Sequence, residues 1–246
     1  MPFALLGIQL LRIARSSGAT PDRLLAGFFL GLAAGIPPRM MGVDLAVRSG
    51  VSWTGFWLST VASVFIGIAL VCLAAFAWKV FRPGEAWAKR LVIAFGAALC
   101  AALLASTRSL EASHAAGLPA ITFNGLGAAA LVWSFVECVR YYRMMRRRQA
   151  LGMGDPVVAN RFLLWSLWAG AIGLQATLMF ALRIAILSSG ASEQLTAGAD
   201  PGSPWIALIH AAKGMLAIVA PVAVVSVWLS FSPPAAYRRW LVASPA

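Results

Sequence analysis

The sequence predicts an all-α protein, a polytopic bundle of transmembrane helices. Three observations predict this class: the composition, the length of the apolar runs and the placement of the basic residues. Of 246 residues, 61% are hydrophobic and 11% are charged, and the mean hydropathy is +0.82. Soluble domains carry about 25% charged residues, so we exclude an ordinary soluble fold. We expect residues 1–246 to form a single transmembrane domain.

Apolar runs define the predicted crossings. A helix rises about 1.5 Å per residue, so a hydrocarbon core of about 30 Å needs roughly 20 residues. Six strong crossings are predicted: Leu24 to Met41, Trp53 to Phe81, Leu91 to Thr107, Ala115 to Val139, Phe162 to Ser189 and Trp205 to Phe231.

The opening run, Pro2 to Ala14, is shorter than these six. It is either a partial helix or a helix that lies in the membrane interface. We count it as a seventh, weaker crossing. Its positive charges follow the apolar run, the reverse of a secretory signal, so we expect it to remain in the mature protein.

The second run contains a face of small residues. Gly27, Gly31 and Gly35 recur at steps of four, which places them on one helix face and lets another backbone approach closely. We expect these glycines to serve helix packing, within the bundle or in a dimer. Pro37 and Pro38 follow, and we expect them to end the helix because proline removes a backbone donor.

The fourth run repeats this small-residue spacing at Gly96 and Cys100 and at Ala97 and Ala101, which favours a tightly packed bundle. Cysteines occur only within apolar runs, so we expect small buried side chains and no disulfide. The three are Cys72, Cys100 and Cys138.

The stretch from Trp133 to Trp165 sets the predicted orientation. Basic residues beside membrane helices are retained in the cytoplasm, and six arginines stand between two apolar runs here: Arg140, Arg143, Arg146, Arg147, Arg148 and Arg161. Alternate loops carry the same bias, so we expect them and the carboxyl terminus in the cytoplasm. Arg39, Arg48 and Arg108 fall on the opposite side, where Arg39 and Arg108 would surround an outward-facing cavity with positive charge.

The net charge of +12 does not indicate nucleic acid, because the basic residues sit at the ends of apolar runs. The expected partners are the lipid bilayer and a separate protein in the membrane or cytoplasm. A separate protein is expected because the sequence stops at Ala246, without an output domain after the last helix.

Ionisable residues inside membrane helices are candidates for function, because each is costly unless it reaches the interface or finds a partner. Arg183 and Gln175 lie on nearly the same face of one run, and His210 and Lys213 share a face of the last run. We interpret these four as ligand-binding residues for a small, anionic or lipidic ligand in the outer half of the bundle. Alternatively, Arg183 extends to the lipid headgroups and Lys213 pairs with an acidic loop residue.

Glu137 lies one turn before Arg140 in the fifth run. We expect an intrahelical contact of Glu137 with Arg140 or Tyr141. The alternative is a cytoplasmic coupling element that also includes Arg143. Tyrosine and methionine alternate with arginine here, so this extension would lie on anionic lipid or dock a cytoplasmic partner. Asp155, followed by proline, predicts the start of the next helix.

Catalytic sequence patterns do not occur. The chain has no H-E-x-x-H, no G-x-S-x-G, no P-loop and no dinucleotide motif. We therefore predict no catalytic residue and no metal site, leave enzyme activity uncertain and name no cofactor. A retinal Schiff base on Lys213 is a weaker alternative, since the third run has no carboxylate to serve as counter-ion.

Three stretches resemble a loose group of uncharacterised bacterial seven-helix integral membrane proteins: GFFLGLAAGIPPRMMG, RYYRMMRRRQALGMGDPVVANRFLLW and SFSPPAAYRRWL. The resemblance implies a multi-pass protein of the bacterial inner (plasma) membrane, similar to membrane-embedded sensor modules. It identifies no catalytic residue. The leading expectation is a receptor or sensor-like protein. A structural or assembly subunit of a larger membrane complex is the main alternative, and a transporter or a lipid-acting enzyme is weaker.

Overall fold

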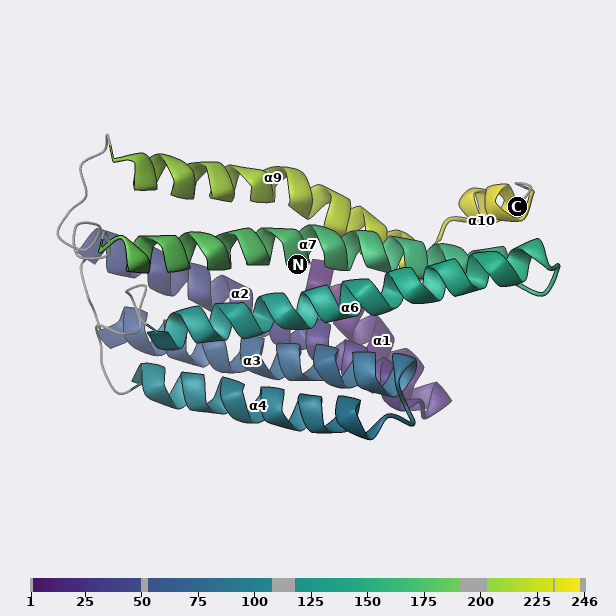
Figure 1. Cartoon of the computed structure of the whole chain (residues 1–246), viewed down its shortest axis with the longest axis horizontal. Coiled ribbons are helices and arrows are strands. Elements are labelled where there is room, and N and C mark those ends of the chain that lie inside the picture. The colour runs from purple at the N-terminus through teal and green to yellow at the C-terminus, as the bar shows by residue number, and fades with distance from the viewer. Residues whose placement is uncertain (1, 50–52, 108–117, 191–202, 232, 244–246) are drawn as a thin grey trace.

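The computed structural model describes residues 2–49, 53–107, 118–190, 203–231 and 233–243, which form helices and no strand. Long helices run side by side along one axis (Figure 1). In chain order, the helices are α1 (Pro2–Ser17), α2 (Thr20–Ser49), α3 (Trp53–Phe81), α4 (Ala86–Thr107), α6 (Leu118–Ala150), α7 (Pro156–Ser188), α9 (Pro204–Phe231) and α10 (Ala235–Ala243).

Six helices are long and apolar enough to cross a membrane: α2, α3, α4, α6, α7 and α9. This confirms the prediction of a multi-pass helical membrane protein. The 16 residues of α1 correspond to about 24 Å at about 1.5 Å per residue, less than the thickness of the hydrocarbon core. A seventh crossing by this segment therefore remains a prediction.

The turns that carry basic residues gather at one end of the bundle. The α1–α2, α3–α4 and α6–α7 turns lie there, together with α10 (Figure 1). We call this the basic end, defined by the lysines and arginines within 12–23, 79–90 and 140–161. We call the other end of the long helices the opposite end. That the basic end faces the cytoplasm remains a prediction.

The glycine face of α2 lies against α3. A Cβ atom at Gly31 would lie 2.8 Å from the carbonyl oxygen of Phe65, and one at Gly35 would lie 2.8 Å from that of Ala62. At Gly27 a Cβ would be 3.0 Å from a cysteine sulfur of α3. Larger residues would push the helices apart, so these glycines allow α2 and α3 to pack backbone to backbone.

The prediction that Pro37 and Pro38 end the helix is wrong, because α2 continues through both to Ser49. Membrane helices tolerate proline where neighbouring helices and local adjustments satisfy the freed backbone groups. The neighbour here is α3: a Cβ at Gly42 would lie 2.9 Å from a carbonyl oxygen of that helix. As a consequence, Arg39 projects from a helix packed on α3 rather than from a loop.

The small residues of α4 do not pack inward as expected. Ala97, Cys100 and Ala101 are exposed, so this spacing does not tighten the packing within the chain. All three cysteines are free; the expectation of burial holds for Cys138 and is wrong for Cys100. The residues that α4 buries are Ala88, Val92, Leu99 and Ala102.

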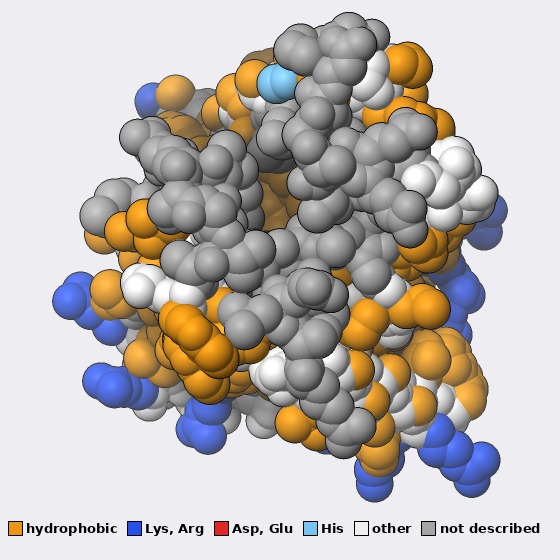
Figure 2. Space-filling view, turned by 90° about the vertical axis from the view of Figure 1, so that its left-hand side faces the viewer, with side chains coloured by type: hydrophobic (Ala, Val, Ile, Leu, Met, Phe, Trp, Pro, Cys, Tyr) orange, Lys and Arg blue, Asp and Glu red, His pale blue; other side chains and the backbone are white. Residues whose placement is uncertain are grey.

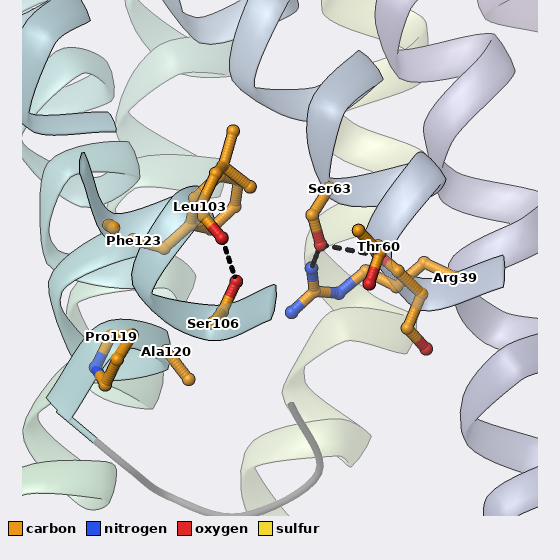
Figure 3. A pocket seen from close by; sticks show the side chains of 10 residues that line it. Arg39, Thr60, Ser63, Leu103, Ser106, Pro119, Ala120 and Phe123 are labelled. Carbon is orange, nitrogen blue, oxygen red and sulfur yellow. Dashed lines mark hydrogen bonds between the residues drawn. The ribbon is translucent and has the colours of Figure 1, made fainter. Parts of the chain in front are cut away.

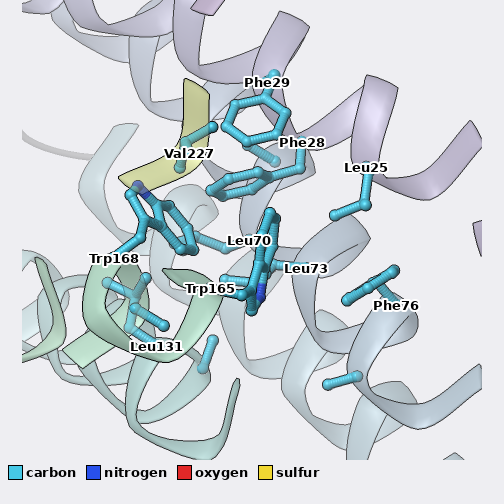
Figure 4. Packing of buried hydrophobic residues seen from close by; sticks show 14 of the residues in the cluster. Leu25, Phe28, Phe29, Leu70, Leu73, Phe76, Leu131, Trp165, Trp168 and Val227 are labelled. Atoms are coloured by element: carbon cyan, nitrogen blue, oxygen red, sulfur yellow. The ribbon is translucent and has the colours of Figure 1, made fainter. Parts of the chain in front are cut away.

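An aromatic cluster joins α2, α7 and α9 (Figure 4). The ring centroids of Phe28 and Trp168 are 5.4 Å apart, and those of Phe29 and Trp165 are 6.2 Å apart. Phe231 of α9 lies 5.7 Å from Trp165. These pairs meet edge to face, a favourable arrangement of aromatic quadrupoles. The cluster attaches α9, which otherwise packs chiefly on α7, to the rest of the bundle.

Candidate functional site

A polar pocket of about 60 Å³ lies between α2, α3, α4 and α6, near the opposite end. Arg39, Thr60 and Ser63 lie on one side of it, and α4 and α6 supply the other side (Figure 3). Its apolar lining includes Leu103 and Phe123. The polar residues that line it are Arg39, Ser59, Thr60, Ser63 and Ser106.

Arg39 is the charged group of this pocket. Its Nη1 donates a hydrogen bond to Ser63 Oγ at 2.8 Å, and Ser63 Oγ in turn donates to the carbonyl oxygen of Ser59 at 2.7 Å. The guanidinium carbon lies 5.8 Å from the centre of the Phe123 ring. A guanidinium has five N–H donors, so a single hydrogen bond to a hydroxyl leaves most of them for a ligand.

A second half-buried arginine, Arg183 on α7, adds positive charge that acts on Arg39 but does not line the pocket. In the described part of the chain, the ion pairs formed by carboxylates involve neither arginine. Like charges in apolar surroundings are unfavourable until an anion compensates them. The arrangement is therefore suited to an anion.

The surface at the opposite end includes hydrophobic side chains of the described residues (Figure 2). Figure 2 looks onto that end, and no aspartate or glutamate of the described residues is visible there. The lysine and arginine side chains in this view lie around its rim.

The volume of the pocket limits what it can hold. Sites for drug-sized molecules measure about 300–1,000 Å³, whereas this pocket has about 60 Å³. A water molecule takes up about 30 Å³. The pocket therefore accommodates a small anion, or the carboxylate or phosphate end of a larger molecule whose remainder lies outside.

The four ligand-binding residues predicted from the sequence do not line this pocket. Gln175 is buried on α7, where its Nε2 donates to the carbonyl oxygen of Ala212 on α9 at 2.7 Å. Its Oε1 is buried without a hydrogen-bond partner among the described residues. His210 is exposed, and the side chain of Lys213 lies outside the described residues. The set is thus divided: Gln175 joins α7 to α9, and Arg183 acts electrostatically on the pocket.

The hydroxyl residues of the pocket were missed by the sequence analysis, although Arg39 was placed beside an outward-facing cavity. Ser59 and Ser63 are four residues apart in an otherwise apolar run, with Thr60 between them. Residues at steps of three and four share a helix face. A hydroxyl face in one run beside an arginine in the preceding run is the signal that could have revealed this pocket.

Glu137 forms the centre of an ion-pair cluster at the basic end. It is 4% exposed, and its Oε1 lies 3.0 Å from Arg82 Nε and 3.9 Å from Arg140 Nη1. Arg82 also lies over the ring of Trp87, 5.8 Å from its centre. The expected contact with Arg140 is present. The closer partner, Arg82, was missed because it belongs to the α3–α4 turn, far from Glu137 in the sequence.

The other two predicted coupling residues differ in their surroundings. Tyr141 lies between two rings, with centroid distances of 4.8 Å to Phe81 and 5.4 Å to Phe162. Arg143 is exposed. The predicted helix start is confirmed, since Asp155 accepts a hydrogen bond from the α7 backbone at 2.8 Å. The described residues contain no group of three His, Cys, Asp or Glu side chains that could hold a metal ion.

Comparisons with protein-family models, with curated proteins and with solved structures found no match for this chain. The structure alone therefore shows a helical protein with six helices that are long and apolar enough to span a membrane. The bacterial origin and the similarity to sensor modules remain predictions from the sequence.

Proposed function

We propose that this protein is a receptor or sensor-like protein of the bacterial inner membrane that binds a small anionic group through Arg39, with the positive charge of Arg183 favouring the anion. One observation carries the proposal: Arg39 is half-buried in a polar pocket, where its guanidinium donates one hydrogen bond to the Ser63 hydroxyl. An ionised side chain inside a membrane bundle is costly without a partner. A bound anion would supply that partner.

The chemistry of the pocket favours a carboxylate or a phosphate group. The planar guanidinium fork of arginine binds both groups with two parallel hydrogen bonds. Thr60 adds a hydroxyl, and Phe123 adds an apolar wall. Because the pocket is small, the rest of an amphiphilic ligand would lie in the lipid or beyond the opposite end.

Helix α6 offers a physical route from this pocket to the basic end. It contributes Phe123 to the pocket and carries Glu137 toward its other end. A ligand that shifts α6 would therefore change the contact between Glu137 and Arg82. We propose that a separate protein partner reads this change at the basic end.

Native mass spectrometry tests the binding step. The full chain is extracted from its own membrane in a mild detergent, as wild type and as Arg39→Gln. We expect a bound anionic molecule with the wild type and its loss in the variant. The matched control is Arg90→Gln, which removes an exposed arginine at the basic end. Retention by Arg39→Gln of every adduct found on the wild type would overturn the proposal. A defined complex with other protein chains and no small molecule would favour an assembly subunit.

A further inference from the structure

A groove lies at the basic end, where α10 approaches the α6–α7 hairpin (Figure 1). Its volume is about 270 Å³. Tyr142, Arg146 and Gln149 of α6 and Asn160 of α7 supply polar groups, while Trp240 belongs to its apolar part. None of these residues contributes to the pocket around Arg39.

Helix α10 is held in place by an aromatic residue that also orders the groove. Tyr237 Oη donates a hydrogen bond to Asn160 Oδ1 at 3.1 Å, and its ring stacks on Trp240 at 5.9 Å. Trp240 is 61% exposed. Exposed tryptophan beside membrane helices prefers the level of the lipid headgroups. The groove therefore faces the interfacial layer rather than the hydrocarbon core.

The charge around the groove is strongly positive. Residues 138–190 contain a single acidic residue, Asp155, and its carboxylate already caps α7 through a 2.8 Å hydrogen bond. Arg146 makes a long hydrogen bond of 3.4 Å to Gln149 Oε1, a neutral group. Four further arginines stand within the same stretch of α6: Arg140, Arg143, Arg147 and Arg148.

We infer that this groove binds the headgroup of an anionic phospholipid. Basic pockets beside membrane helices attract such headgroups. The phosphodiester would pair with Arg146 and accept hydrogen bonds from Tyr142 and Asn160. The acyl chains would leave the groove past its apolar part beside Trp240 and enter the hydrocarbon core. A volume below that of a drug-sized site holds a headgroup rather than a whole lipid.

The positive charge of the groove determines which lipids it favours. Phosphatidylcholine has a compensating choline and no net charge, so it gains less from this basic surface than phosphatidylglycerol does. An acidic protein segment would also match the charge but does not use a small groove at headgroup level. The inference therefore commits to a lipid and is independent of the pocket around Arg39.

The test is native mass spectrometry of the full chain after incubation with equal amounts of phosphatidylglycerol and phosphatidylcholine. We expect the wild type to retain phosphatidylglycerol preferentially. Arg146→Gln should lower this retention about fivefold, equivalent to about 1 kcal/mol for the loss of one surface charge. Arg90→Gln, which removes an exposed arginine of the basic end outside the groove, should leave it unchanged. Circular dichroism and a monodisperse elution profile establish that each variant is folded.

A second variant removes the dependence on one substitution. Trp240→Ala deletes an exposed side chain and should also lower phosphatidylglycerol retention without changing the net charge. Two results would overturn the inference. One is equal loss of lipid in Arg146→Gln and Arg90→Gln, which indicates diffuse attraction. The other is equal retention of the two lipids by the wild type. Either result would leave the proposed anion site around Arg39 standing, because Arg146→Gln does not alter that pocket.

Discussion

Replacing Gly35 with alanine should disturb the contact between α2 and α3 that positions Arg39. The added Cβ would lie 2.6 Å from Ile66 Cγ1, 2.8 Å from the carbonyl oxygen of Ala62 and 3.1 Å from the backbone nitrogen of Ile66. Two of these three atoms belong to the backbone and cannot rotate away. The helices must therefore separate. Arg39 lies one turn along α2 and bonds to Ser63, the residue after Ala62.

Two opposing effects determine how much Gly35→Ala changes the free energy of unfolding. Overpacking of a close contact costs about 1–3 kcal/mol, whereas alanine in place of glycine within a helix gains about 1 kcal/mol. The matched control is Gly214→Ala on α9, because a Cβ there would meet no atom within 4 Å. Both variants share the helix gain. Gly35→Ala should therefore be about 1–3 kcal/mol less stable than Gly214→Ala, the cost of the contact alone.

Equilibrium unfolding in mixed micelles with increasing sodium dodecyl sulfate, followed by tryptophan fluorescence, measures both free energies. Gly35→Ala should also retain less of the bound anion in native mass spectrometry, because its pocket is displaced. Equal stability of the Gly35 and Gly214 variants would refute the argument. It would mean that α2 and α3 do not approach as closely as described.

Three further changes probe the basic end. Arg82→Gln leaves the buried Glu137 carboxylate with only its more distant arginine and should cost about 2–4 kcal/mol; Glu137→Gln should cost less because Arg82 is partly exposed. The double variant, Arg82→Gln with Glu137→Gln, should lose less free energy of unfolding than the two single variants lose together in the same assay. Strict additivity would contradict the ion pair. Asp155→Ala should cost about 1 kcal/mol, with faster hydrogen exchange in the first turn of α7. Tyr237→Phe removes the bond to Asn160 and should speed exchange across α10; unchanged exchange would show that this bond does not hold α10.

Composition and hydropathy were sufficient to predict the helical membrane class, because both report directly on the solvent around the helices. They were less informative about helix ends. Helix α6 continues to Ala150, about three turns beyond the predicted crossing that ends at Val139, and these turns form the arginine-rich extension expected from the sequence. Its arginine-rich turns are polar, but arginine, methionine and glutamine are good helix formers. Hydropathy finds the apolar part of a helix, and helix propensity decides how far the helix extends.

The contacts between helices were harder to predict. A membrane helix is apolar all round, so its sequence lacks the periodicity that shows which face points inward. The exposed Cys100 of α4 and the buried hydrogen bond from Gln175 to α9 illustrate this. Arg183 was identified as a candidate because it is charged, yet Arg39, on which its charge acts, comes from a helix far away in the sequence. Such pairs depend on helix rotation, which only the folded bundle specifies.

The anion site around Arg39 is tested most directly by ligand-dependent stability. Wild type and Arg39→Gln are unfolded in mixed micelles with increasing inorganic phosphate or acetate, at constant ionic strength. A ligand that binds the folded state stabilises it by about 1.4 kcal/mol at ten times its dissociation constant. We expect at least one of the two anions to stabilise the wild type in a saturable manner and neither to stabilise the variant. The same response in both proteins, or no saturable response in the wild type, would contradict the account.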